Sequence, residues 1–161
     1  MKIEIDDLES REIGAFLQEH IADMKSISPP ESKHALDLEG LKAPEITFWS
    51  AYEDGLLIGC GALKELDACT GEIKSMRVRA SARAGGIGSK ILSHIVNEAE
   101  SRGYRVLKLE TGSMEYFVPA RNLYLKYGFR LCEPFGSYKS DPNSVFMELG
   151  LDVRHSPVQE S

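Results

Sequence analysis

A glycine-rich segment placed directly before a helical pattern carries the clearest chemical signal in the sequence. Its residues are Arg83, Ala84, Gly85, Gly86, Ile87, Gly88 and Ser89. The first turn of a helix presents free backbone N–H groups and the positive end of the helix dipole. Glycine lets a ligand approach the backbone without a Cβ clash. The segment therefore suits a phosphate group, although a tight turn that only requires glycine is the simpler alternative.

Two widespread phosphate-binding loops match this segment poorly. A Walker A loop ends in Gly-Lys-Ser/Thr, whereas the order here is Gly88-Ser89-Lys90. A dinucleotide-binding loop needs three glycines in the pattern G-x-G-x-x-G, and its third position here is Ile91. A nucleotide-binding module built on this loop is a disfavoured alternative.

Three further side chains could take part in proton transfer. Tyr124 lies on the apolar side of a short predicted helix, where its phenol could donate a proton or pack in the core. Glu72 begins the strand that leads to Met76, as a candidate base or as an ordinary solvated carboxylate. His34 has the neutral pKa that suits proton uptake, but a lone histidine in a polar helix is more often a surface residue. Glu110 is a weaker candidate.

Two separated segments together resemble the GNAT superfamily of N-acetyltransferases. Met76-Arg77-Val78 followed by the run from Arg83 to Gly88 is similar to its acetyl-CoA motif, which contains R/Q-x-x-G-x-G/A. Ala120 to Tyr124 followed by Gly128-Phe129 resembles its A-x-x-L-Y-x-x-x-G-F signature. The strong resemblance covers residues 46–149. Residues 28–32, 44–50 and 141–147 further resemble YsnE-like bacterial acetyltransferases.

The resemblance implies how acetyl-CoA is held. The backbone from Arg83 to Ser89 would bind the pyrophosphate, and the strand residues Met76, Arg77 and Val78 would align the pantetheine arm. The family often has Asn where this chain has Phe117. Thr111, Ser113 or Asn122 could replace that polar contact.

The resemblance also implies catalytic roles. The Met76 N–H would polarise the thioester carbonyl, and Tyr124 would protonate the leaving thiolate. Glu72 stands four residues before Met76, the offset at which some members carry a general base. In this family fold the acceptor cleft would lie among the segment from Met24 to Leu41, Trp49 and the pair Lys64-Glu65.

The expected function is transfer of an acetyl group from acetyl-CoA to a primary amine by direct attack in a ternary complex. The acceptor is a small molecule or a peptide that the sequence does not identify. A non-catalytic module that binds acetyl-CoA as a sensor or partner is the main alternative, and retention of Tyr124 favours the enzyme. Homodimers are common in such folds, but the sequence leaves the oligomeric state open.

The strands and helices that must position these residues follow in an order that predicts an α+β fold, with a mixed central sheet and about four flanking helices. An antiparallel meander comes first, and a strand–helix–strand unit then adds one parallel pair. The expected strands are 2–5, 46–52, 56–63, 72–78, 104–110, 129–132 and 144–149. The expected helices are 10–24, 31–41, 87–102 and 119–127.

Composition limits the class of protein further. The length of 161 residues predicts one domain, over 1–152, with a frayed tail over 153–161. The net charge of -6 argues against nucleic acid or a membrane as a partner. Three cysteines without a C-x-x-C pair predict no metal site and no disulfide framework. No signal peptide or long apolar run is found, so we expect a cytoplasmic protein.

Overall fold

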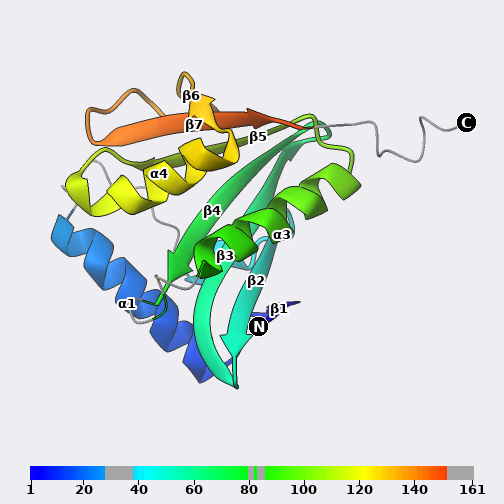
Figure 1. Ribbon diagram of the computed structural model, residues 1–161, viewed down its shortest axis with the longest axis vertical. Helices are drawn as coiled ribbons and strands as arrows, with labels where there is room; N and C mark the ends of the chain where they lie inside the picture. Colours follow the sequence, from blue (N-terminus) through cyan, green and yellow to red (C-terminus); the bar gives the residue numbers. More distant parts are fainter. Residues whose placement is uncertain (28–37, 80–81, 83–85, 152–161) are drawn as a thin grey trace, which may run out of the picture.

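A seven-stranded mixed sheet forms the centre of the computed structural model, which describes residues 1–27, 38–79, 82 and 86–151 (Figure 1). The sheet order is β1-β2-β3-β4-β5-β7-β6, and only the β4–β5 pair is parallel. The strands are β1 (Lys2–Ile5), β2 (Ile46–Glu53), β3 (Leu56–Asp67), β4 (Thr70–Val78), β5 (Val106–Gly112), β6 (Arg130–Leu131) and β7 (Ser144–Gly150). The predicted antiparallel meander and single parallel crossover are therefore confirmed.

One face of the sheet is covered by α3 (Ile87–Ser101) and α4 (Val118–Tyr127). The apolar stripe expected for α3 is fully buried there: Ile87, Ile91, Leu92, Ile95, Val96 and Ala99. Gly128, with a φ of 116°, ends α4 in the left-handed conformation that favours glycine. Trp49 belongs to this core and meets His94 edge to face, so it does not line a cleft.

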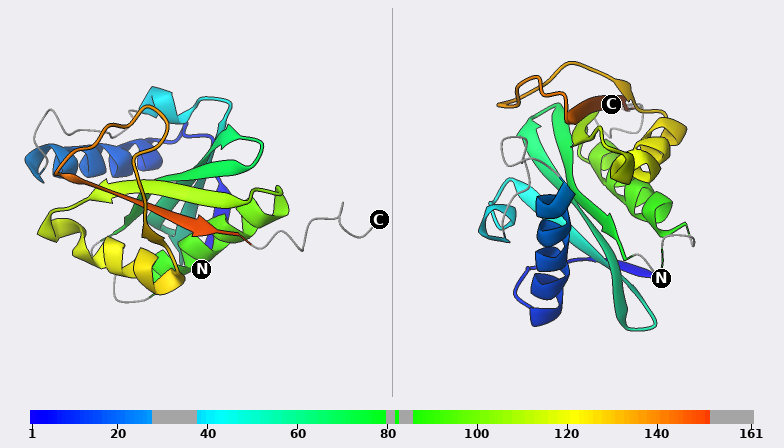
Figure 2. Two further views of the ribbon diagram at one scale, coloured as in Figure 1. Left: turned by 90° about the horizontal axis from the view of Figure 1, so that it is seen from above. Right: turned by 90° about the vertical axis from the view of Figure 1, so that its left-hand side faces the viewer.

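The opposite face is covered by α1 (Arg11–Ile27) and the short α2 (Leu38–Leu41). Ser10 caps α1, since its hydroxyl accepts a hydrogen bond from the Ile13 N–H at 3.2 Å. Ile13, Phe16 and Leu17 then pack on the sheet in a second core cluster. The right-hand view of Figure 2 shows α1 on one side of the sheet and α3 and α4 on the other.

Strand β4 carries the irregularity that shapes the site. Its antiparallel pairing with β3 skips from Cys60↔Arg77 to Ala62↔Lys74, and Ser75 between them has a φ of 55°. Two β4 residues thus oppose one on β3, the arrangement of a β-bulge. The parallel pairing with β5 ends at Ile73↔Leu109. Beyond Ile73, β4 parts from β5, as Figure 1 shows.

The element boundaries follow the sequence-based predictions closely, with strands β3 and β4 longer than expected. A short 3-10 turn (Glu115–Phe117) that the prediction missed precedes α4. The predicted helix over 31–41 is seen only as α2, because residues 28–37 lie outside the described part of the chain, as do 153–161. Within the described ranges, no helix is both long and apolar enough to cross a membrane.

Candidate active site

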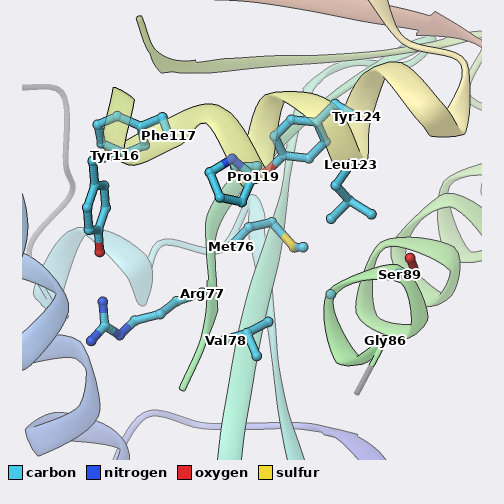
Figure 3. Close-up of a pocket in the computed structure, with 12 residues that line it drawn as sticks. Met76, Arg77, Val78, Gly86, Ser89, Tyr116, Phe117, Pro119, Leu123 and Tyr124 are labelled. Atoms are coloured by element: carbon cyan, nitrogen blue, oxygen red, sulfur yellow. The ribbon is translucent and has the colours of Figure 1, made fainter. Parts of the chain in front are cut away.

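A pocket of about 260 Å³ lies where β4 parts from β5, between β4, the start of α3 and the start of α4 (Figure 3). Its walls bring together the glycine segment, the strand residues and the tyrosine that the sequence singles out. The residues that line it are Met76, Arg77, Val78, Gly86, Gly88, Ser89, Tyr116, Phe117, Pro119, Ala120, Leu123 and Tyr124.

The start of α3 forms one end of this pocket. Gly86 is the N-cap residue, with a φ of 75°, and among the described residues no side chain caps the first N–H groups of the helix. Gly88 and Ser89 line the pocket with it, whereas Ile87 is buried in the core. A Cβ on Gly88 would lie 3.2 Å from Leu123 Cδ2, so a side chain would fill the space between the helices. This end fits a phosphate group.

Residues 83–85 of the predicted phosphate loop, Arg83, Ala84 and Gly85, lie outside the described part of the chain. The expected backbone cradle can therefore be followed only from Gly86 onward.

The side chains of Met76, Arg77 and Val78, three consecutive residues of β4, alternate between the two faces of the sheet. Met76 and Val78 pack against the core under α3 and α4. Arg77 extends toward α1, where its guanidinium lies 5.5 Å from the centre of the Phe16 ring. The backbone of this segment therefore borders the α3 end of the pocket, while the Arg77 side chain reaches toward its other end (Figure 3).

Tyr124 lines the same pocket from α4 and is only 5% exposed. Its ring meets Phe129 edge to face at 5.6 Å. Burial raises the pKa of the Tyr124 phenol well above its usual range, because the phenolate form would lose its hydration. The phenol is therefore protonated, and a hydrogen-bond donor, across the pH range in which amines react.

The residues weighed as partners for the cofactor arm differ in position. Phe117, which stands where the family often has Asn, is buried and lines the pocket. Asn122 is exposed and is not among the lining residues. The Ser113 hydroxyl donates to the Pro142 carbonyl at 2.7 Å, outside the pocket.

Glu72 lies in a second cavity, of about 560 Å³, on the α1-facing side of β4. It is only 3% exposed, which rules out the alternative of a solvated carboxylate. Its Oε2 accepts hydrogen bonds from the Tyr138 hydroxyl at 2.7 Å and from Lys74 Nζ at 3.0 Å. Lys74 Nζ also donates to the Tyr138 hydroxyl at 2.9 Å. Together the three side chains form a closed, partly buried network.

Tyr138 and Tyr116 are site residues that the sequence analysis missed. Tyr138 lies in the connection between β6 and β7, a segment without periodicity, and only the fold brings it to Glu72. Burial and the neighbouring Glu72 carboxylate raise the pKa of the Tyr138 phenol. Tyr116 lies in the unpredicted 3-10 turn.

The remaining candidates lie elsewhere. Glu110 accepts a hydrogen bond from the Ser144 hydroxyl at 2.8 Å, and Glu65 accepts one from the Tyr104 hydroxyl at 2.7 Å. Lys64 lines the second cavity, beside Glu72 in the β3–β4 pairing. His34 and residues 28–37 of the expected acceptor wall lie outside the described residues.

Comparison of the sequence with known proteins leads to the same family as the resemblance of its motifs. The model of the acetyltransferase (GNAT) family covers residues 13–129. The chain belongs to this family. It is 58% identical over 151 residues to an uncharacterized N-acetyltransferase, YsnE, of Bacillus subtilis. The alignment covers 94% of this chain and 100% of that relative. By family and by fold, this GNAT protein is an acyltransferase.

Solved structures share the architecture of this GNAT domain. An acetyltransferase of the GNAT family from Staphylococcus aureus superposes with a TM-score of 0.72 at 22% identity, covering 94% of this chain and 100% of that one. A GNAT family acetyltransferase from Elizabethkingia anophelis, solved with acetyl-CoA bound, superposes with a TM-score of 0.62 at 19% identity, covering 93% and 97%. At these identities the likeness establishes the fold.

Proposed function

We propose that this protein is an acetyl-CoA-dependent N-acetyltransferase that acetylates a primary amine by direct attack in a ternary complex. The observation that carries the proposal is the single pocket that joins the open start of α3 to the β4 segment and Tyr124. When bound, acetyl-CoA supplies the acetyl group as a thioester. An acetyl-CoA-bound relative with the same fold supports this choice of cosubstrate.

Different backbone groups of the chain would bind different parts of acetyl-CoA. The free N–H groups from Gly86 to Ser89 would bind the pyrophosphate at the positive end of α3. The backbone of Met76 and Val78 would align the pantetheine arm along β4. The bulge at Ser75 takes Met76 out of the regular β3–β4 register. The Met76 N–H would then stabilise negative charge on the carbonyl oxygen, a contribution commonly worth about 100-fold or more in rate.

Proton transfer would involve two groups. The acceptor must attack as a neutral amine, although alkylamines have a pKa near ~10.4. Glu72 is the proposed base, because Lys74 and Tyr138 both bond to its Oε2, and no other described residue bonds to its Oε1. As the C–N bond forms and the C–S bond breaks, the Tyr124 phenol would donate a hydrogen bond and then its proton to the thiolate. The products are the N-acetylated amine and free coenzyme A.

Calorimetric titration with acetyl-CoA, with NADH and ATP as controls, tests the proposal first. We expect selective binding of acetyl-CoA and, in an amine-library assay with thiol detection, release of coenzyme A that depends on the acceptor. Preference for NADH or ATP would overturn the assignment of the α3 end of the pocket. Binding of acetyl-CoA without turnover of any amine would favour a sensor module instead.

A further inference from the structure

Gly112, the last residue of β5, leaves room for an aromatic ring. A Cβ at this position would overlap with Cδ2 and Cε2 of the Phe117 ring and would lie 2.9 Å from its Cγ. Gly112 does not have a positive φ, so its backbone conformation is open to residues other than glycine. The ring, and not the backbone, therefore requires glycine here. Phe117 fills the space that a side chain on β5 would otherwise take.

Arg121 holds the same connection from α4. Its Nη1 donates to the Gly112 carbonyl at 2.6 Å and to the Met114 carbonyl at 3.0 Å. Hydrogen bonds from a charged guanidinium are stronger than those between neutral groups. The Phe117 N–H also donates to the Met114 carbonyl, at 3.0 Å. Because the backbone is held at both ends of this turn, the side chain of Phe117 is the part that can move.

Phe117 stands between this connection and the pocket. The residue is only 9% exposed, and it lines the pocket together with Tyr116, whose ring it meets edge to face at 5.0 Å. The same wall continues through Pro119 and Tyr124 on α4 (Figure 3). The pocket is the open space beside the buried ring, so a side chain at position 112 would push the ring toward it.

We propose that Gly112 is a positioning residue for acetyl-CoA, which acts through Phe117 by keeping its ring out of the part of the pocket that takes the pantetheine arm. The proposal rests on the acetyl-transfer function proposed above. Members of the family often carry Asn at the position of Phe117, and an amide is smaller than a phenyl ring. The larger ring fits beside the arm because β5 has no side chain at Gly112.

Calorimetric titration with two ligands tests this proposal. The ligands are acetyl-CoA and the phosphorylated ADP moiety of coenzyme A without its pantetheine arm. Gly112→Ala should weaken the binding of acetyl-CoA by about ten-fold, within the range for an overfilled site. Binding of the ADP moiety should change less than about two-fold, because its phosphates bind at the start of α3. Equal losses for the two ligands, or unchanged binding of acetyl-CoA, would overturn the proposal.

Gly71→Ala is the matched control. A Cβ at Gly71 would also be crowded, at 2.8 Å from Leu63 Cδ1 and 2.9 Å from Tyr104 Cδ2, but Gly71 lies in β4 outside the pocket lining. The variant should be less stable in urea, with an affinity for acetyl-CoA within about two-fold of the wild type. If it weakens binding as much as Gly112→Ala does, crowding within the sheet explains both losses and the proposal fails.

Removal of the ring gives a second test. In a Phe117→Asn background, Gly112→Ala should have little effect on acetyl-CoA binding, because no ring is left to move. The same should hold in a Phe117→Ala background. A double-mutant cycle measures this coupling, since independent positions give additive losses. Additive losses in both backgrounds would show that Gly112 does not act through Phe117.

The outcomes also separate this inference from the proposed function. Selective binding of acetyl-CoA without coupling between Gly112 and Phe117 overturns the inference and leaves the acetyltransferase assignment standing. A wild-type protein that binds neither acetyl-CoA nor its ADP moiety overturns both.

Discussion

Tyr124 is a side chain whose role is decided by its surroundings. On sequence alone its phenol fits a core position as well as a catalytic one. In the structure the ring packs on Phe129 while the residue also lines the pocket, so its place in the core is compatible with the proposed catalytic role. Because burial raises the pKa of the phenol, it stays protonated and can donate to a leaving thiolate.

We expect Tyr124→Phe to lower kcat by about 100-fold, the lower end of the range for general acid catalysis. The affinity for acetyl-CoA should change less than about three-fold, since the ring and its packing remain. Steady-state kinetics and calorimetric titration of the same preparation measure the two effects. An equal loss of binding and turnover would show that the hydroxyl is structural.

At the scale of elements, the start of α3 and the bulge in β4 determine the site. Gly86 occupies the left-handed region with a φ of 75°, where a side chain is strained even though open space surrounds it. Gly103, just beyond the other end of α3, has a φ of 84° and equally open surroundings. The two glycines differ in their distance from the pocket and are otherwise closely matched.

Gly86→Val should therefore abolish measurable acetyl-CoA binding, because the side chain blocks the approach of the phosphate. Gly103→Val introduces similar backbone strain at the opposite end of α3. It should cost stability but leave affinity within about two-fold. Binding measured by calorimetry on both variants decides the matter: equal losses would mean that strain in α3, and not access to its N-terminus, controls binding.

The bulge makes a separate prediction through Ser75. A β-branched residue is a steric outlier at a positive φ, so Ser75→Val should destabilise the fold by about 1–3 kcal/mol. Ser75→Gly relieves the strain and should leave stability the same or higher. Urea unfolding of both variants measures this. A Ser75→Val protein as stable as the wild type would mean that β4 adopts a regular strand without cost.

At the scale of the whole molecule, two buried weak acids and one half-buried phenol make stability sensitive to alkaline pH. Burial raises the pKa of the Tyr124 and Tyr138 phenols, and it raises the pKa of the Cys60 thiol to about 12. The unfolded chain releases these protons near their ordinary pKa values, about 8.5 for the thiol and 10 for the phenols. The folded chain then binds more protons, so the free energy of unfolding falls as pH rises.

We expect the urea midpoint to be unaffected by these groups below about pH 8 and to drop steadily above pH 9. Tyr124→Phe removes one contributor, so between pH 8 and 10.5 it should lose about 1 kcal/mol less than the wild type. Parallel slopes for the two proteins would show that the Tyr124 phenol ionises as easily in the folded state as in the unfolded one.

The sequence predicts most of this architecture because periodicity and turn residues are local signals. The helical stripe from Ile87 to Ala99 and the meander from Ile46 to Val78 were expected, and both are confirmed. The bulge at Ser75 has no such signal, since a serine at a positive φ looks like any other serine. The sequence therefore places Glu72 four residues before Met76 but does not show that the bulge turns the two side chains to opposite faces.

The sequence does not reveal the partly buried network around Glu72, for a different reason. Its phenol comes from Tyr138, 66 residues later in the chain. The connection between β6 and β7 has no repeating pattern that would indicate its path. Long-range contacts of this kind follow from tertiary packing, which single-sequence patterns do not encode.

The β4–β5 pairing ends at Ile73↔Leu109, so the proposed mechanism can use both sides of the sheet at this point. Coenzyme A would enter from the side of α3 and α4, and the acceptor would enter from the side of α1. Both substrates could then be bound at the same time. The amine could attack the thioester directly, and no covalent acetyl-enzyme would be needed. Initial-rate plots at several fixed acceptor concentrations should therefore intersect, as in a sequential mechanism, and should not run parallel.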